Sequence, residues 1–420
     1  MHRGCIPTRA MLEAAGIADA VTTRGPRWGI EAVLEKVALS RLIGTRDDIV
    51  QRNYRAVRHH LDHAGVQLFE GWGRLTDARS VEVNGMAVVA KRAVVVATGS
   101  EPRRFDRIEP DGSIVLTSDG ALGLGDTPGS AVILGGGAIG VEFAQIWGAF
   151  GADVTILERE ERLAPFEDAA VGATLSRALA RRGIRSVTGI RVENVETSPE
   201  GVTVRVTRNG RSESHRAEVL LLAAGRSPAT GSIGLEDVGV DLPGGYVSTD
   251  GSLETRVPGV YAVGDVLAPP SIGRANAAFA EGMVAADAIA GLSPSPLDYT
   301  QMPRVTHGII ETACVGLSEE AASSAGLEPR SMALPGSAVP KGAILGEPGM
   351  TKVVLDGDDL VVGIHLVGPN ATEIIGEATA LTNFQASAQE AATLVHPHPA
   401  LSESLHELHL ALSGRPLHLR

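Results

Sequence analysis

The sequence predicts an α/β fold, with two related domains built on parallel strands and a C-terminal α+β domain. Three observations predict it. A glycine-rich loop at residues 135–140 lies between an apolar strand and a helix. Residues 94–102 have the same pattern as residues 220–228, position by position. Beyond residue 300, short strands and helices are mixed within about 120 residues, an ordinary size for one domain.

Length and composition exclude several classes of protein. A chain of 420 residues has room for about two to four domains. The 37 basic and 50 acidic side chains give a net charge of −13 without a basic patch, so we expect no nucleic-acid partner and no membrane partner. No apolar run reaches the roughly 18 residues that cross a bilayer. Two cysteines, Cys5 and Cys314, are too few for a disulfide scaffold, which favours a reducing, cytoplasmic location.

The N-terminal part is predicted to begin with a helix. Pro7 is tolerated in a first helical turn, and apolar residues recur from Met11 until loop residues follow near position 23. Cys5 is therefore expected just ahead of a helix N-terminus. A second helix is predicted at residues 46–63 from its apolar spacing. Short strands follow, the last with the continuous apolar composition of a buried parallel strand, at residues 66–69, 81–83 and 93–97.

The glycine loop belongs to a complete βαβ pattern. Strands at residues 131–134 and 153–157 flank the loop and the helix that follows it. Gly135 permits the turn, Gly137 lets the backbone approach a pyrophosphate at the helix N-terminus, and Gly140 lets the helix pack on the sheet. The pattern predicts dinucleotide binding, and a glycine-rich turn without a ligand is the alternative interpretation.

An acidic residue, Glu158, ends the strand that follows the glycine loop. Its carboxylate can accept hydrogen bonds from a ribose diol and would repel a 2′-phosphate, which favours NAD over NADP. Arg159 and Arg162 lie close by in the sequence and weaken that preference.

The repeated pattern implies two copies of one Rossmann-like domain. A helix at residues 168–182, an antiparallel meander around Asn209-Gly210 and a strand at residues 219–223 complete the second copy. The strand end at residues 97–99 has its counterpart at residues 223–225. Only the second copy contains a glycine loop. The first copy would need roughly 30 further residues upstream to hold its own strand, glycine turn and helix. We therefore expect the first domain to be truncated at its N-terminus.

The remaining chain begins with a strand that leads into Gly264-Asp265, and an alanine-rich helix is predicted at residues 275–290. After a break at Met302-Pro303, the α+β region includes a strand at residues 360–367 and a helix at residues 372–383.

The two cysteines have different surroundings. A helix N-terminus carries partial positive charge, so it would favour the thiolate form of Cys5, whereas a buried, inert thiol is the alternative. Cys314 lies in an apolar stretch between Ala313 and Val315, and we interpret it as structural.

The octet at residues 396–403 holds two histidines and one glutamate. One interpretation makes a histidine a general base that Glu403 orients. The other is a proline-rich turn with solvated histidines, and the octet alone does not separate the two. A metal site is less favoured, because no cysteine or further histidine cluster lies nearby in the sequence.

Together these residues resemble the pyridine nucleotide disulfide oxidoreductases and, within them, the dihydrolipoamide dehydrogenases. The resemblance covers essentially all 420 residues. It rests on Gly4-Cys5-Ile6-Pro7, Ala97-Thr98-Gly99, the glycine loop with Glu142, Ala224-Gly225-Arg226, Gly264-Asp265 and the octet.

The resemblance implies a division of the chain into parts. Residues 1–128 and 248–300 would form an FAD-binding domain, residues 129–247 an NAD-binding domain, and residues 301–420 the interface domain of a homodimer. FAD and NAD are the implied cofactors. The partner would be a lipoyl-bearing protein or a small disulfide or dithiol substrate.

The resemblance also implies a redox disulfide between cysteines five positions apart, of which Cys5 would be the second. The first would fall immediately before Met1, and the FAD-binding glycine loop would lie further upstream. The 420 residues alone are therefore expected to bind FAD poorly and to have little lipoamide activity.

In such an enzyme hydride passes between the nicotinamide and the flavin, which exchanges electrons with the cysteine pair. His398, held by Glu403, would be the acid–base catalyst for the partner subunit's outer thiol. The family has a lysine where this chain has Arg9, and that residue would pair with Glu142. The cofactor-binding positions implied are Thr98, Gly99, Gly225, Gly264, Asp265, Ala275 and Ala277.

Three functions remain open on the sequence. The leading one is an FAD-dependent, NAD-linked dithiol oxidoreductase, with dihydrolipoamide as the substrate. The second keeps flavin and NAD(P)H and reduces quinones or other acceptors. The third is a catalytically silent, truncated subunit that binds NAD and dimerises.

Overall fold

The computed structural model describes residues 2–105, 108–271 and 273–418, so the expectation about Met1 lies outside the described residues. The chain divides into two compact units. The first consists of Met1–Ala56, Phe105–Ala224 and Pro303–Arg420. The second consists of Val57–Arg104 and Gly225–Met302.

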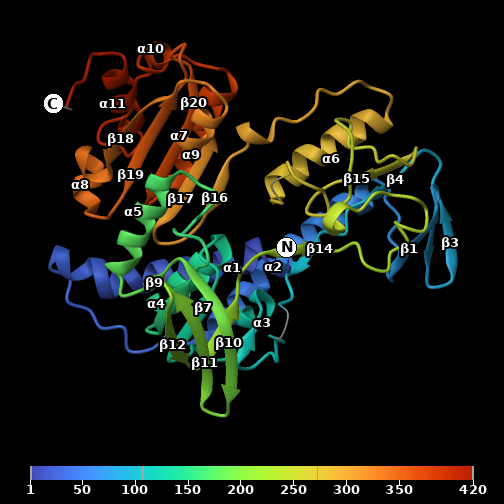
Figure 1. Cartoon of the computed structure of the whole chain (residues 1–420), viewed down its shortest axis with the longest axis horizontal. Coiled ribbons are helices and arrows are strands. Elements are labelled where there is room, and N and C mark those ends of the chain that lie inside the picture. Colours follow the sequence, from blue (N-terminus) through green and yellow to red (C-terminus); the bar gives the residue numbers. More distant parts are fainter. Residues whose placement is uncertain (1, 106–107, 272, 419–420) are drawn as a thin grey trace. The chain divides into compact units, whose positions relative to one another are not determined.

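A five-stranded parallel sheet forms the centre of the first unit (Figure 1). Its strands lie in the order β6 (Val115–Leu116), β13 (Val219–Leu222), β7 (Ser130–Leu134), β8 (Asp153–Leu157) and β9 (Arg185–Val187). Helix α4 (Ala138–Ala149) connects β7 to β8, and helix α5 (Ala169–Ala180) connects β8 to β9. The strand, glycine loop, helix and strand that the sequence predicted are confirmed. Helix α3 (Ser118–Leu122) follows β6, with Thr117 as its N-cap.

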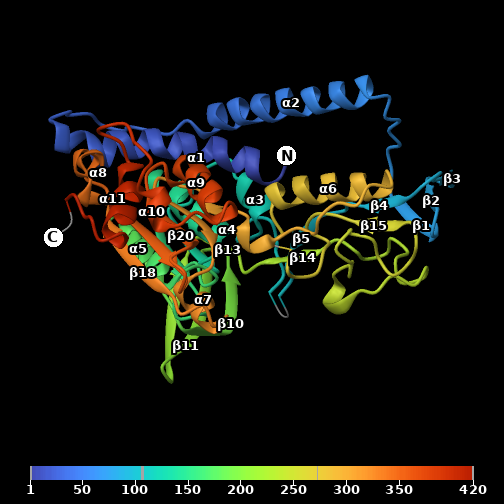
Figure 2. The same cartoon turned by 90° about the horizontal axis from the view of Figure 1, so that it is seen from above.

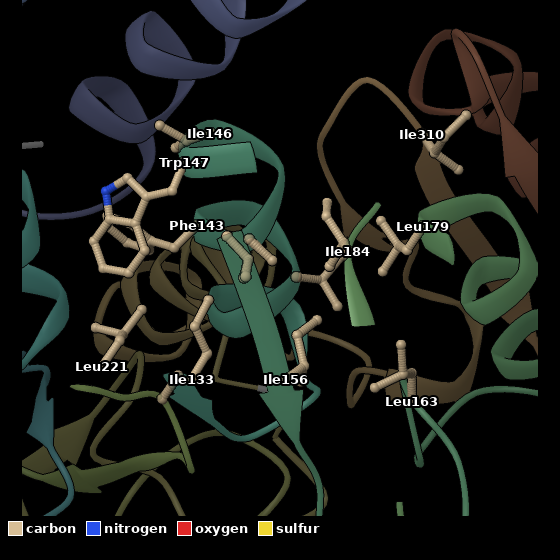
Figure 3. Packing of buried hydrophobic residues seen from close by; sticks show 14 of the residues in the cluster. Ile133, Phe143, Ile146, Trp147, Ile156, Leu163, Leu179, Ile184, Leu221 and Ile310 are labelled. Carbon is tan, nitrogen blue, oxygen red and sulfur yellow. The ribbon is translucent and has the colours of Figure 1, made fainter. Parts of the chain in front are cut away.

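The apolar core of this unit explains why these segments fold as they do. The strands β7, β8 and β13 are buried almost along their whole length, as expected of parallel strands covered on both faces. Figure 3 shows Ile133 and Ile156 of the sheet packed with Phe143 and Trp147 of α4. Ile310, from the C-terminal part of the chain, belongs to the same cluster, so the parallel-sheet domain and the C-terminal domain share one core.

An antiparallel meander lies beside the parallel sheet, as the alternating valines predicted. It consists of β10 (Ile190–Ser198), β11 (Gly201–Arg208) and β12 (Arg211–Ala217), and Asn209-Gly210 makes the second turn with positive φ at both residues. Val202, Val204 and Val206 point into the core from β11.

The C-terminal domain is a five-stranded antiparallel sheet with helices (Figure 1). Its strands lie in the order β16 (Arg304–Thr306), β17 (Glu311–Gly316), β20 (Val361–Gly368), β19 (Met350–Leu355) and β18 (Arg330–Pro335). Its helices are α7 (Glu319–Ser324), α8 (Pro340–Leu345), α9 (Ala371–Asn383), α10 (Ala388–Ala391) and α11 (Glu403–Leu412). Residues of α9 and α11 bury one face of the sheet, and the other face packs toward the core of the parallel sheet.

The chain begins with two helices, as predicted. Helix α1 (Cys5–Asp19) packs on α4 (Figure 2) and continues as a short π-helix (Ala20–Arg24) and a 3₁₀ turn (Gly25–Trp28). Helix α2 (Leu39–His63) starts seven residues earlier than the periodicity indicated, because Leu39 packs into the apolar core and stabilises the first turns.

The second unit contains three small sheets and one long helix. The sheets are β1 (Gly73–Asp77) with β2 (Ser80–Val83) and β3 (Met86–Val89), β5 (Ser100–Pro102) with β14 (Arg226–Pro228), and β4 (Val94–Val96) with β15 (Val260–Ala262). Helix α6 (Ala275–Ile289) follows β15, and 3₁₀ turns of this unit lie at Pro243–Gly245 and Tyr299–Gln301, whereas the 3₁₀ turn at Gly336–Ala338 belongs to the C-terminal domain of the first unit.

Two predictions for this unit were wrong. Residues 66–69 form no strand, since Val66, Leu68 and Phe69 are each about 40% exposed (44%, 41% and 39%) and have no pairing partner among the described residues. Strand β4 pairs in parallel with β15, and a parallel strand was predicted here. The predicted burial was wrong, because β4 is only half-buried and Val95 is 44% exposed. An apolar run alone does not report whether both faces of a strand are covered.

None of the helices in the described residues combines the length and the apolar composition needed to span a membrane.

Candidate functional site: thiol, glycine loop and histidine–glutamate pair

The candidate redox thiol lies at the start of α1. Cys5 is the first residue of the helix, Gly4 is the N-cap, and the thiol is exposed and free. Thr8 closes the first turn, with both its backbone N–H (3.1 Å) and its hydroxyl (2.9 Å) donating to the carbonyl of Gly4. The thiol is therefore held at the positive end of a helix dipole.

One helical turn after Cys5, Arg9 forms an ion pair with Glu142 of α4. The distance from Arg9 Nη1 to Glu142 Oε1 is 3.0 Å, and the carboxylate is almost fully buried. The backbone N–H of His307 donates to the same oxygen at 3.2 Å. The pairing that the resemblance implied is present, and it connects α1, α4 and the segment after β16.

The glycine loop has the geometry that each glycine was expected to provide. Gly135 has φ of +115°, and a Cβ there would lie 2.5 Å from the carbonyl oxygen of Ala223. A Cβ at Gly140 would overlap the carbonyl oxygen of Gly135. Helix α4 can therefore pack this closely against the loop only because residue 140 is a glycine. Gly137 is the N-cap of α4, and a Cβ there would meet open space.

Glu158 lies beside this loop at the end of β8 and is buried. One carboxylate oxygen accepts the backbone N–H of Gly136 (2.6 Å), and the other accepts that of Glu160 (2.8 Å). A carboxylate has about four acceptor positions, so two remain for ligand hydroxyls. Arg159 pairs with Glu160 (2.7 Å) and Arg162 with Glu320 (3.4 Å).

The two repeated segments meet in the second unit. Strands β5 and β14, which follow the Thr98-Gly99 and Ala224-Gly225 pairs, are hydrogen-bonded to each other as antiparallel partners. Gly99 and Gly225 both have positive φ, at +77° and +108°. Thr98 Oγ1 donates to the carbonyl of Ala229 at 2.7 Å. The two segments that share a sequence pattern are therefore also in direct contact in the structure.

Gly264 and Asp265 lie after β15, also in the second unit. Gly264 has φ of +79°, and Asp265 accepts a hydrogen bond from Ser100 Oγ at 2.5 Å. Helix α6 begins at Ala275, as predicted, and Ala277 is buried in its first turn.

Sequence reasoning missed a buried carboxylate that anchors this turn. Glu281 of α6 is 0% exposed and accepts hydrogen bonds from the backbone N–H of Gly264 (2.6 Å), from Ser271 Oγ (2.8 Å) and from Tyr299 Oη (3.0 Å). Burial and the negative charge of Glu281 raise the pKa of Tyr299, so this phenol remains a donor. The available signal was an acidic residue within an otherwise apolar stretch of helix.

His398 and Glu403 form the pair that the octet suggested. His398 Nδ1 lies 2.8 Å from Glu403 Oε1, and the backbone N–H of Ala400 donates to Glu403 Oε2 at 2.7 Å. Burial acts to raise the pKa of Glu403, but the hydrogen bonds from Ala400 and His398 outweigh it, and the pKa is lowered. The carboxylate is therefore ionised and accepts from Nδ1–H, which leaves Nε2 of the exposed ring as a proton acceptor.

The other histidine of the octet is held differently. His396 is almost fully buried, its Nε2 lies 2.8 Å from Glu377 Oε1, and its ring stacks on His406 with 5.2 Å between centroids. His409 of α11 lies deeper, at 1% exposure, and neither ring nitrogen has a hydrogen-bond partner in the described residues. Burial, followed by the charges of His396 and His406, lowers the pKa of His409 to about 4.

Comparison with known proteins agrees with this geometry. The sequence model of the pyridine nucleotide-disulphide oxidoreductases matches residues 1–282, and that of the dimerisation domain of the same family matches residues 302–409. The dihydrolipoyl dehydrogenase of Bacillus subtilis is 31% identical over 436 residues, covering 100% of this chain and 91% of that protein. That of Thermus scotoductus is 36% identical over 426 residues, covering 100% and 90%.

Solved structures give the same result. The crystal structure of LpdA from Mycobacterium tuberculosis has a TM-score of 0.87 and 26% identity, covering 98% of this chain and 90% of that one. The flavoprotein disulfide reductase RclA of Escherichia coli has a TM-score of 0.81 at 23% identity, which shows the shared fold. This chain therefore belongs to the pyridine nucleotide-disulphide oxidoreductase family.

Proposed function

We propose that this protein is an FAD-dependent, NAD-linked dihydrolipoyl dehydrogenase, which converts dihydrolipoamide and NAD⁺ to lipoamide, NADH and a proton. The observation that carries the proposal is the 2.8 Å hydrogen bond between His398 and Glu403, because thiol oxidation requires a group that accepts the thiol proton. Full-length similarity to dihydrolipoyl dehydrogenases supports the choice of substrate.

His398 is the proposed acid–base catalyst, and Glu403 holds its ring. Since Nδ1–H donates to Glu403, Nε2 can accept a proton from a thiol and return it in the reverse direction. The resulting imidazolium would be stabilised by the adjacent carboxylate. In the proposed homodimer, which the match to a dimerisation domain supports, His398 acts on the thiols of the partner subunit.

Cys5 is the proposed flavin-facing thiol of the redox pair. Its exposed position at the first residue of α1 leaves the sulfur accessible for such exchange. Arg9 and Glu142 are proposed to lie beside the flavin, as their counterparts in the family do. Their ion pair fixes the first turns of α1 against α4.

The loop at residues 135–140 is the proposed NAD site, and its residues fit that ligand. The open space at Gly137 allows a pyrophosphate to approach the N-terminus of α4, while Gly135 and Gly140 keep the turn tight. Glu158 would accept the ribose hydroxyls. Because Arg159 and Arg162 already pair with carboxylates, neither is committed to a 2′-phosphate, which supports NAD over NADP.

The proposed FAD-binding residues belong to the second unit. Asp265 is partly exposed and would accept hydrogen bonds from the ribityl hydroxyls, and the first turn of α6 would stabilise negative charge through its dipole. The backbone at Gly99 is open, which fits close approach of a ligand. When bound, FAD supplies the electron transfer between nicotinamide and dithiol. The other positions proposed to contact it are Thr98, Gly225, Gly264, Ala275 and Ala277.

The proposed domains keep the boundaries that the sequence indicated. Residues 1–128 and 248–300 would bind FAD, residues 129–247 would bind NAD, and residues 301–420 would form the dimer interface. A lipoyl-bearing protein or a small disulfide or dithiol is the proposed partner.

The test compares two acceptors on one purified sample of the protein expressed from its complete coding region, including any coding sequence upstream of Met1. We expect flavin absorbance, and NADH oxidation that depends on lipoamide and exceeds that with quinones. His398→Gln should lower lipoamide turnover by about 100-fold or more, the lower end of what general acid–base catalysis contributes, and leave quinone turnover near its original value. His59→Gln, on the exposed face of α2, is the matched control.

Two outcomes would overturn the proposal. A protein that reduces quinones and not lipoamide would be an acceptor reductase of the same family. A colourless protein without either activity would be a silent subunit.

A further inference from the structure

A buried row of polar side chains crosses the C-terminal sheet. Arg304 of β16 is paired across the strands with Cys314 of β17, Cys314 with His365 of β20, and His365 with Lys352 of β19. Side chains at paired positions share one face of a sheet, so these four project together. Glu167, immediately before α5, lies over this row, and Figure 1 shows α5 against the same sheet.

Three of these residues have metal-ligand chemistry. One carboxylate oxygen of Glu167, Sγ of Cys314 and one imidazole nitrogen of His365 lie within 4.8 Å of one another. Cys314 and His365 are 0% exposed and Glu167 is 9% exposed. Thiolate, imidazole and carboxylate are the three side-chain ligands of Zn²⁺ in proteins, and contraction by roughly 1 Å would bring them to a common ion.

The imidazole of His365 is prepared as a ligand. Its Nε2 lies 3.0 Å from the carbonyl oxygen of Leu317, which can only accept, so Nε2 carries the proton. Nδ1 then has a lone pair, and it is buried without a hydrogen-bond partner among the described residues. A backbone carbonyl that fixes the tautomer in this way is the usual outer-shell partner of a metal-bound histidine. An unpaired buried nitrogen is costly unless a ligand uses it.

The carboxylate of Glu167 is also held in place by a residue that is not one of the three candidate ligands. Arg304 donates to it through Nε (3.1 Å) and Nη2 (3.0 Å), mainly at Oε2. Oε1 receives a single longer contact of 3.3 Å, so it keeps acceptor capacity. Arg304 would thus remain as the outer partner of a bound carboxylate.

The surrounding charges suit a divalent cation. Lys352 lies 2.9 Å from the buried Asp168 and 2.7 Å from Glu319, so the group of charged side chains comprises two cations and three carboxylates, of which Glu319 lies at the surface. Loss of the Cys314 proton would make its net charge −2, which one divalent ion neutralises. Sγ of Cys314 would bind such an ion as the thiolate, so the ion displaces the thiol proton.

We propose that Cys314, His365 and Glu167 form a structural site for one zinc-class divalent cation, which joins β17 and β20 to the segment before α5. The ion would replace the thiol proton, which is released to solvent. The site lies outside the residues assigned to catalysis, so its failure would leave the proposed function unaffected.

The two cysteines provide a matched pair of variants for the test. In chelator-treated Cys5→Ser protein, Cys314 is the remaining thiol of these 420 residues, and we expect one equivalent of Cd²⁺ per chain with a thiolate-to-metal absorption band in the ultraviolet. Zn²⁺ should compete for the same site and raise Tm. Cys314→Ala should lose the buried band while circular dichroism reports an intact fold.

A second variant separates ligation from packing. His365→Gln can still donate to the carbonyl of Leu317 but lacks the imidazole lone pair. Its Cd²⁺ affinity should fall by more than the roughly 10- to 100-fold that loss of an outer-shell partner costs. Folded Cys5→Ser protein without the band would overturn the proposal, even if the Cys314 variant fails to fold. An equal band in a Cys5→Ser, Cys314→Ala double variant would overturn it as well.

Discussion

Arg9 of α1 and Glu142 of α4 form an ion pair in which Arg9 Nη1 lies 3.0 Å from Glu142 Oε1. The backbone N–H of His307 donates to the same oxygen. A single buried carboxylate therefore fixes the helix that carries Cys5 against α4 and against the segment that follows β16. Packing of α1 on α4 and this ion pair both hold α1 in place.

Removal of Arg9 should destabilise this arrangement. Arg9→Ala removes the cation that pairs with the buried carboxylate, so we expect the free energy of unfolding to fall by about 1 to 3 kcal/mol. This loss is smaller than the cost of breaking a fully buried ion pair, because Arg9 is one-third exposed. Urea denaturation measures the loss. Arg9→Lys should restore part of it, and an Arg9→Ala, Glu142→Gln double variant should lose less than the sum of the single variants. Additive losses would show that the pair is not coupled.

Glu403 should matter for turnover through the orientation of His398. Glu403→Gln keeps the size of the side chain and removes the charge that accepts from Nδ1–H, so kcat with lipoamide should fall by about 100-fold with little change in KM. Glu377→Gln is the matched control, because Glu377 holds His396 in the same kind of hydrogen bond. An equal loss in both variants would contradict a specific role for Glu403.

His409 should make the folded state sensitive to acid. Its pKa is lowered to about 4 by burial, whereas an unfolded histidine titrates near pH 6.5. The unfolded chain thus binds a proton that the folded chain refuses, so stability is present above about pH 6.5 and is lost as pH falls toward 4. The loss should be roughly 2 to 3 kcal/mol.

Thermal unfolding between pH 7 and 4 checks this prediction. His409→Leu should flatten the dependence, and it should not destabilise the protein at pH 7, because the imidazole has no hydrogen-bond partner within the described part of the chain to lose. The exposed His59→Leu is the control and should keep the slope. The same slope in the His409 variant would assign the sensitivity to other groups.

Two alanine substitutions should separate folding from nucleotide binding in the glycine loop. Gly140→Ala places a methyl group onto the carbonyl oxygen of Gly135, so we expect a loss of about 3 kcal/mol or more. Gly137→Ala meets open space, so the fold should persist while the methyl group obstructs the approach of NADH. Tm and the Kd for NADH measure the two effects. Normal NADH affinity in Gly137→Ala would exclude this loop as the site.

Local patterns in the sequence predicted much of the fold and the candidate site. The βαβ start followed from an apolar strand, glycines at fixed spacing and an apolar helix, all within one short segment. The His398–Glu403 pair was accessible for the same reason, since the two residues are five positions apart. Such features depend on residues that are close in the sequence, so they can be predicted without knowing which distant segments pack together.

Features that depend on distant segments were not predictable. Glu281 supports Gly264 from another element, and its role depends on burial that no single stretch reveals. The row from Arg304 to Lys352 exists because four strands align in one register. The expected strand at residues 66–69 failed for the converse reason, because its apolar residues find no partner strand among the residues that the structure describes.

The most direct test of the central claim is the lipoamide turnover of a Cys5→Ser variant. Serine keeps the size of the side chain at the start of α1 but cannot form a disulfide. NADH-dependent lipoamide reduction should fall to the background rate, while flavin content and quinone reduction stay close to those of the parent protein. Lipoamide reduction at the parental rate in Cys5→Ser would contradict the account, because the thiol at the helix N-terminus would then take no part in the reaction.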